Sequence, residues 1–211
     1  MKLHKSIQTK QTTRLFNGKY KYKIVLLSKA ASWFRGGEVE KIKNARDSGA
    51  NWTWSKKLDV SDKAHANKII SSLELMADYT IRVESPYINF YTNNEKDVET
   101  LAKIASDRVK YVSLPLPGSE PLLDERKILV KNLDYDFRVT MGRTKSNHSN
   151  FVEWCKGKED RVRLPKSATK HLSKDHSWGG YYFYVKDEKT LTMVKMFISE
   201  GINLVENVVK T

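Results

Sequence analysis

The sequence predicts an α+β fold made of two similar halves, each with a mainly antiparallel sheet. The first observation behind this prediction is a strand–helix–strand pattern that occurs twice, in residues 90–112 and 183–205. The two segments align without a gap and share Phe90/Phe183, Tyr91/Tyr184, Glu95/Glu188, Lys96/Lys189, Ser106/Ser199 and Val112/Val205. Because fixed-offset self-similarity is the signature of a repeated structural unit, we interpret the pair as an internal duplication.

The second observation is a matching pair of strands ahead of these segments. Residues 17–24 (NGKYKYKI) and 132–139 (NLDYDFRV) share the asparagine and Tyr20/Tyr135, and both alternate aromatic or aliphatic residues with charged ones. Alternation with a period of two is typical of a half-buried strand. Each half therefore opens with an aromatic, basic strand. Two unrelated strand–helix units that match by chance remain the alternative, since short self-matches are weak evidence.

The remaining elements of both halves follow from apolar periodicity and turn signals. In the first half we expect helices at 38–46, 59–78 (with Ser61 as N-cap) and 95–105, and strands at 80–84, 87–92 and 109–114. In the second half we expect extended sequence at 127–141, strands at 161–164, 180–185 and 202–209, helices at 147–156 and 188–199, and a polar loop at 167–177. Both halves then have the β-α-β-β-α-β order of the ferredoxin-like topology.

This order sets the predicted domain organisation. Residues 1–18 are polar and basic and form an N-terminal arm, residues 19–114 the first ferredoxin-like repeat, and residues 127–211 the second. The linker between them, residues 115–126, contains three of the five prolines.

Composition restricts the class of protein. The chain has 211 residues, 39% of them hydrophobic and 30% charged, and it contains no apolar run long enough to span a bilayer. The N-terminus has no apolar core of a secretory signal, and a single cysteine, Cys155, excludes an internal disulfide. The sequence therefore predicts a cytoplasmic protein without a membrane partner. With no phosphate-loop lysine, dinucleotide fingerprint or metal-ligand spacing of histidines, we expect no cofactor.

The excess of basic residues points to a polyanionic partner. Lysines and arginines number 38 against 25 aspartates and glutamates, and residues 1–37 contain no acidic residue before Glu38. A second basic stretch covers residues 156–174. Charge concentrated in this way is typical of a surface that meets nucleic acid. A solvated face that confers solubility is the alternative.

Two resemblances carry this further. Residues 179–185 (GGYYFYV), followed by a helix and a last strand, resemble the third strand of an RNA-recognition-motif domain, in which alternating aromatic residues stack on bases. The resemblance implies the fold and not a ribonucleoprotein identity, because residue 179 is not basic and residues 87–92 lack the glycines. The segments TTRLFNGKYKYKI and HSNFVEWCKG resemble uncharacterised proteins of tailed bacteriophages, which implies action in the host cytoplasm.

Strand alternation assigns side chains to the two faces of each sheet. Ile88 and Phe90 align with Tyr181 and Phe183, and we expect these four in the core, so the neighbouring tyrosines face the other way. Basic and aromatic side chains on one sheet surface bind single strands by phosphate attraction and stacking. The candidate nucleic-acid-binding residues on strands are Lys21, Lys23, Tyr91, Arg138, Arg161, Arg163, Tyr182 and Tyr184. A preference of tyrosine for strands in general is the alternative.

Loops supply the other candidates. Arg35 and Trp178 each lie beside a glycine pair, where the backbone can approach a ligand closely. Lys166, Lys170 and Lys174 alternate with hydroxyl residues in a segment that we expect to contact phosphates. We expect Trp52, Trp54 and Trp154 to anchor loops to the core instead.

The sequence therefore predicts a non-catalytic nucleic-acid-binding protein for DNA or RNA, with single strands preferred. One alternative is a virion, assembly or host-interaction protein with a phage or host protein as partner. Another is a metal-independent nuclease that uses His148 or His176 near Lys174 and Tyr182, a layout that resembles tandem ferredoxin-like CRISPR RNA-processing enzymes.

Overall fold

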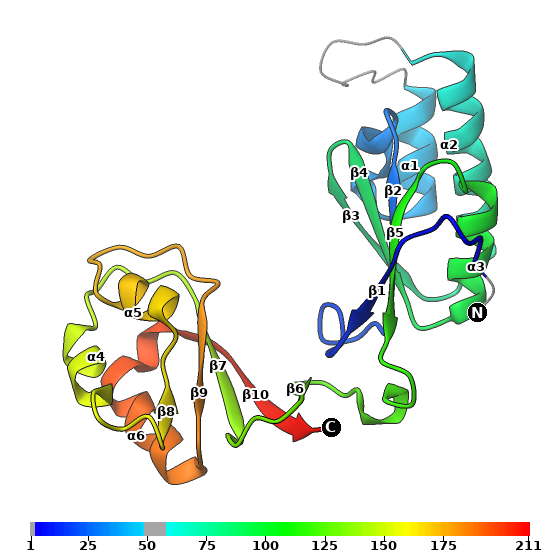
Figure 1. Cartoon of the computed structure of the whole chain (residues 1–211). Helices are drawn as coiled ribbons and strands as arrows, with labels where there is room; N and C mark the ends of the chain where they lie inside the picture. The colour runs from blue at the N-terminus through cyan, green and yellow to red at the C-terminus, as the bar shows by residue number, and fades with distance from the viewer. Residues whose placement is uncertain (1–2, 49–57) are drawn as a thin grey trace. The chain divides into compact units, whose positions relative to one another are not determined.

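The chain forms two compact units, residues 1–121 and 122–211. The computed structural model describes residues 3–48 and 58–211. Each unit contains a five-stranded, mainly antiparallel sheet with several helices, as Figure 1 shows. The predicted α+β class is therefore confirmed. The division between the units falls inside residues 115–126, where the sequence predicts a linker.

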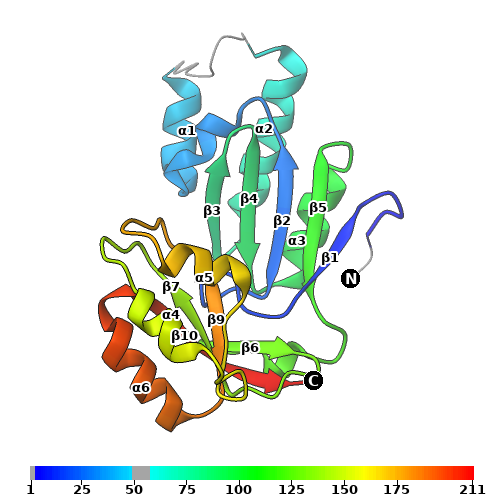
Figure 2. The same cartoon turned by 60° about the vertical axis from the view of Figure 1, so that its left-hand side comes forward.

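The first unit has the strand order β1-β5-β2-β4-β3. Its strands are β1 (Thr9–Thr12), β2 (Tyr22–Leu27), β3 (Tyr79–Glu84), β4 (Tyr87–Thr92) and β5 (Val109–Pro115). Its helices are the 3-10 helix η1 (Ala31–Gly36), α1 (Val39–Asp47), α2 (Val60–Leu73) and α3 (Glu95–Ile104). Only β1 is parallel to its neighbour, β5. Figure 2 shows α2 and α3 behind one face of this sheet.

The second unit has the strand order β6-β10-β7-β9-β8. Its strands are β6 (Lys127–Val130), β7 (Phe137–Met141), β8 (Val162–Arg163), β9 (Tyr182–Val185) and β10 (Ile202–Lys210). Its helices are α4 (Ser149–Cys155), α5 (Lys166–Leu172), α6 (Glu188–Ile198) and the 3-10 helix η3 (Ser199–Gly201), and η2 (Glu120–Leu122) lies where the two units join. Here β6 is the parallel strand, paired with β10.

The two sheets share their strand order and also their register. Ile24 faces Phe90 and Val112 on its neighbouring strands, and Val139 faces the aligned residues Phe183 and Val205. Both last strands contain a β-bulge at the same place. Val25 pairs with Tyr111 and Leu26 with Val109, and the aligned Thr140 and Met141 pair with Leu204 and Ile202. Lys110 and Asn203 are thus the extra residues of two equivalent bulges.

The core of each unit lies between its sheet and its helices. Phe34 packs edge-on against Phe90 in the first unit, with ring centres 6.1 Å apart, and Phe151 packs against Phe183 in the second at 5.4 Å. All four residues that the alternation assigns to the core, Ile88, Phe90, Tyr181 and Phe183, are buried. The prediction of which strand face is buried is therefore confirmed.

Three elements differ from the sequence prediction. Residues 9–12, inside the expected arm, form β1 and pair with β5, and Ile7 ahead of them is buried, so this segment is part of the sheet. The expected polar loop at 167–177 begins with α5, because Ala168 and Leu172 bury one side of a helical turn. The N-cap of α2 is Asp59 and not Ser61, since the Asp59 carboxylate accepts the Asp62 N–H at 2.7 Å.

Two further predictions concern the tryptophans at 52 and 54 and the absence of a membrane span. Trp52 and Trp54 lie outside the described residues. Across 3–48 and 58–211, the model contains no helix with the length and apolar content that a membrane crossing requires.

Candidate nucleic-acid interface

The outer face of the second sheet carries a row of polar and aromatic side chains across four strands. Arg138 on β7 lies opposite Tyr184 on β9 and Glu206 on β10, and Arg163 on the edge strand β8 also lies opposite Tyr184. Helices α4, α5 and α6 pack on the other side of this sheet (Figure 1). Alternation along the strands therefore gathers these residues on the side away from the core.

Tyrosine rings dominate this face. Tyr182 meets Tyr184 edge to face, with ring centres 5.7 Å apart, and Tyr184 lies 6.3 Å from Tyr135. Tyr182 is 38% exposed, whereas Tyr184 is half-buried and its burial raises the pKa of its hydroxyl. Tyr182 is thus the ring of this group that is most open to a ligand, with Tyr184 as its support.

Arg138 lies against Tyr182 and is largely enclosed. Its guanidinium carbon is 3.9 Å from the centre of the Tyr182 ring, and its Nη1 is 3.5 Å from Oε2 of Glu206. The Arg138 side chain is 11% exposed. A guanidinium in this place holds the tyrosine ring by a cation–π contact, so Arg138 acts as a positioning residue.

A second exposed aromatic side chain stands at the end of this unit, on a loop beside β7. Trp178 is 85% exposed, and the guanidinium carbon of Arg143 lies 4.7 Å from its ring centre. The backbone groups of Thr144 and Ser177 exchange two hydrogen bonds of 2.9 and 3.0 Å, which join the two loop segments. Sequence reasoning selected Trp178 and missed Arg143, whose position after β7 offered no motif.

Glycine permits the close approach of these loop segments. Gly179 has a φ of +79°, and a Cβ atom there would lie 2.4 Å from the backbone carbon of Gly142. Because any larger residue would collide with backbone, only glycine at position 179 permits this close approach to Gly142.

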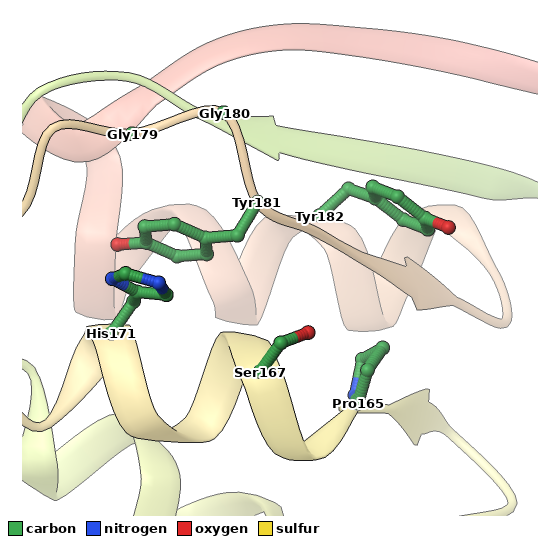
Figure 3. Close-up of a pocket in the computed structure, with 7 residues that line it drawn as sticks. All are labelled: Pro165, Ser167, His171, Gly179, Gly180, Tyr181 and Tyr182. Atoms are coloured by element: carbon green, nitrogen blue, oxygen red, sulfur yellow. The ribbon is translucent and has the colours of Figure 1, made fainter.

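A cavity of about 310 Å³ lies between α5 and the start of β9, as Figure 3 shows. It is lined by Pro165, Ser167, His171, Gly179, Gly180, Tyr181 and Tyr182. Tyr181 stacks on His171, with ring centres 5.1 Å apart and planes 10° from parallel. The side chains of Tyr181 and Tyr182 point away from each other (Figure 3), and Tyr181 is buried whereas Tyr182 is exposed. Its size is at the small end of ligand sites, roughly 300–1,000 Å³.

Five predicted basic contacts lie around this cavity and the edge strand. Arg161, Arg163, Lys166, Lys170 and Lys174 are all exposed. The hydroxyl groups interleaved with the lysines are less available than expected, because the Thr169 hydroxyl donates to the Pro165 carbonyl and the Ser173 hydroxyl to the Thr169 carbonyl. Helix α5 therefore satisfies these hydroxyls itself, and its lysines carry the charge that faces solvent.

The binding residues predicted in the first unit are mostly paired or buried. Lys21 forms an ion pair with Glu120 at 3.1 Å. Tyr91 is buried, at 6% exposed, and its ring centre lies 5.7 Å from that of Phe16. Lys23 is half-buried, with its Nζ 5.5 Å from the Tyr91 ring centre. Arg35 is exposed at the end of η1 and does not belong to this sheet face. On the outer face of the first sheet, Tyr91 is therefore covered by the chain's own Phe16 and is closed to a ligand.

No match was found. Comparisons of the chain with protein-family models, with curated proteins and with solved structures all returned nothing. The interpretation of this surface therefore depends on its own residues.

The residues of the nuclease alternative do not share one site. His148 lines a different cavity from Tyr182, together with Lys145 and Glu200. Burial lowers the pKa of His148, while His176 is exposed. Trp154 packs against Phe151 and Phe197, in agreement with the anchoring role predicted for it. Among the described residues, no group of three or more histidine, cysteine, aspartate or glutamate side chains is arranged to hold a metal ion.

Proposed function

We propose that the protein is a non-catalytic nucleic-acid-binding protein of two ferredoxin-like repeats that binds a single strand on its second unit. The fold part of the proposal is supported by the strand orders. Without the extra parallel strands β1 and β6, the sheets have the orders β5-β2-β4-β3 and β10-β7-β9-β8. These place the first and third strands of each β-α-β-β-α-β unit at the centre, as in the ferredoxin-like topology.

The observation that carries the binding proposal is a pair of exposed aromatic rings, each with an arginine against it. Trp178 contacts Arg143, and Tyr182 contacts Arg138. Trp178 is 85% exposed, so a face of its ring is accessible for stacking on a base. An arginine that fixes a ring prepares it to stack on a base, and stacking of this kind requires unpaired bases.

Charge near the rings supports the same partner. Arg163 extends the row of Tyr184 on the edge strand, and Lys166, Lys170 and Lys174 follow along α5 and its end. These exposed cations would neutralise phosphates of a strand that passes Tyr182 and Trp178. The cavity beside Tyr182 has room for a single flat group such as a base.

A titration of fluorescently labelled single- and double-stranded DNA and RNA tests the proposal. We expect single strands to bind more tightly, and affinity to fall steeply between about 50 and 200 mM salt because counterions are released from the phosphates. Trp178→Ala and Tyr182→Ala should each weaken binding by about 1–3 kcal/mol, the usual value of one stacked base.

The matched controls lie on α6, on the side of the helices. Phe197→Leu removes a 43% exposed ring and Lys195→Ala an exposed cation, and neither should change affinity. Affinity that is independent of salt, or that falls equally in Phe197→Leu and Trp178→Ala, contradicts the proposal.

A second candidate is binding of a phage or host protein. It is favoured by an apolar patch on α6, where Met196 is 82% exposed next to Phe197, which contacts Trp154 at 5.2 Å. If this surface mediates assembly, the protein should be found in purified virus particles, and Met196→Glu should remove it from them.

A further inference from the structure

Arg108 in the first unit and Gly201 in the second occupy equivalent positions. The Leu27 N–H donates to the Arg108 carbonyl at 2.8 Å, and the aligned Gly142 N–H donates to the Gly201 carbonyl at the same distance. Both residues directly precede a last strand that starts one residue later and contains the equivalent bulge. The duplicated fold thus places an arginine and a glycine at one backbone site.

In the first unit the side chain of Arg108 forms an ion pair with a buried carboxylate. Nη1 of Arg108 lies 2.8 Å from Oδ1 of Asp62, whose side chain is 2% exposed. Lys29 contributes a second cation, 3.0 Å from Oδ2 of the same carboxylate. Asp62 is therefore the buried centre of a charged network at this end of the first sheet, which Asp59 and Asp107 extend through Lys29 and Arg108.

In the second unit Gly201 packs closely against Met141, Thr144 and His148, and a cavity lies beside these residues. A cavity of about 270 Å³ is lined by Arg143, Thr144, Lys145, Ser146, His148, Glu200 and Gly201. Thr144 is 94% buried, and its Oγ1 has no hydrogen-bond partner among the described residues. Nε2 of His148 is also buried and has no hydrogen-bond partner among the described residues. Buried polar atoms are nearly always satisfied, so these two atoms beside the cavity are available to hydrogen-bond a bound group.

The lining indicates the charge of this ligand. Arg143 and Lys145 are cations, and the hydroxyls of Thr144 and Ser146 can donate hydrogen bonds. One carboxylate, Glu200, opposes them and is exposed. A set dominated by donors and cations is suited to an anion with several oxygens, such as phosphate.

Arg143 joins this cavity to the proposed nucleic-acid interface, because its guanidinium also contacts the Trp178 ring at 4.7 Å. We propose that the cavity binds the terminal phosphate monoester of a strand whose last base stacks on Trp178. This inference rests on the proposed function. A monoester carries about two negative charges and continues into one chain only, whereas an internal diester must leave the site on both sides.

Three oligonucleotides of one sequence test the inference: with a 5′-phosphate, with a 3′-phosphate and with hydroxyls at both ends. We expect one phosphorylated form to bind about tenfold more tightly than the hydroxyl form, as a charge-assisted hydrogen bond typically contributes. Lys145→Ala and Thr144→Val should bring this ratio close to one. Glu200→Gln should increase it, because it removes the opposing carboxylate.

Control variants and outcomes separate this inference from the proposed function. Lys195→Ala should leave the ratio unchanged. Gly201→Arg would copy the residue of the first unit, but its Cβ atom would lie 2.6 Å from Cε of Met141 and 2.9 Å from Cγ2 of Thr144 and would disturb the packing. The isosteric Thr144→Val is therefore the decisive variant. Equal, salt-dependent binding of all three oligonucleotides overturns the terminal-phosphate site alone. Absence of any oligonucleotide binding overturns the proposed function together with this site.

Discussion

The guanidinium of Arg138 lies between two partners of opposite character, the ring of Tyr182 at 3.9 Å and the carboxylate of Glu206 at 3.5 Å. Both charged side chains are almost enclosed, with Arg138 11% and Glu206 4% exposed. The arginine therefore contributes to the stability of the second sheet as well as to the place of the tyrosine ring.

Arg138→Met tests this double role. The variant keeps an unbranched apolar stem but removes the cation next to a buried carboxylate, which should lower the free energy of unfolding by about 3 kcal/mol. Urea denaturation of Arg138→Met, Glu206→Gln and the double variant measures the coupling between the two residues. If the two single losses simply add in the double variant, Arg138 and Glu206 do not stabilise each other.

The network around Asp62 predicts a dependence of stability on pH. Burial alone would raise the pKa of Asp62, but hydrogen bonds from Arg108 and Lys29 outweigh it and hold the pKa below the usual 3.8. A lowered pKa stabilises the fold above the unfolded value and loses this effect as pH falls through the folded value. The free energy of unfolding should therefore decrease as pH falls below about 4.

Asp62→Asn should remove part of that pH dependence and cost about 3 kcal/mol at neutral pH, since it removes the buried charge that both Arg108 and Lys29 contact. The matched control is Asp59→Asn, which keeps the oxygen that caps α2 and removes an exposed charge. A pH profile of Asp62→Asn that is identical to the wild type would refute this role.

Cys155, the one cysteine of the chain, should be unreactive while the protein is folded. Burial raises the pKa of its thiol to about 12, so the thiolate that attacks disulfide reagents is scarce. Labelling with a chromogenic disulfide at about pH 8 should be slow for the native protein and fast in denaturant. Fast labelling of the native protein would mean that α4 opens readily.

Removal of residues 1–12 should destabilise the first unit. Strand β1 pairs with β5 through Thr9 to Thr12, and Ile7 is buried. Losing the burial of the Ile7 side chain alone should cost about 2 kcal/mol. The midpoint of urea unfolding should fall measurably. An unchanged midpoint would support the free arm that the sequence suggested.

Periodicity and the internal repeat were sufficient to predict the class of fold and the buried faces. The alignment of Phe90 with Phe183 and of Ile24 with Val139 is visible in the sequence because core positions in both halves must remain apolar. The strands and helices that the sequence predicts at 87–92, 95–105, 188–199 and 202–209 agree with β4, α3, α6 and β10 to within one residue at either end.

The edge strand β1 and the burial of Tyr91 could not be predicted from the sequence pattern. Strand β1 has no apolar alternation, because it lies at the edge of the sheet and three of its four residues are exposed. The burial of Tyr91 depends on Phe16, which comes from a segment without a recognisable pattern. The replacement of Arg108 by Gly201 is visible in the alignment, but its consequence requires knowledge of what surrounds each residue.

The equivalent bulges at Lys110 and Asn203 also bear on how the two halves of the chain evolved. An extra residue acquired after the halves had diverged would be present in one of them only. If the two halves arose by the internal duplication that the sequence predicts, this irregularity was already present in the ancestral unit. The difference between Arg108 and Gly201, at equivalent positions, then arose after the two halves had separated.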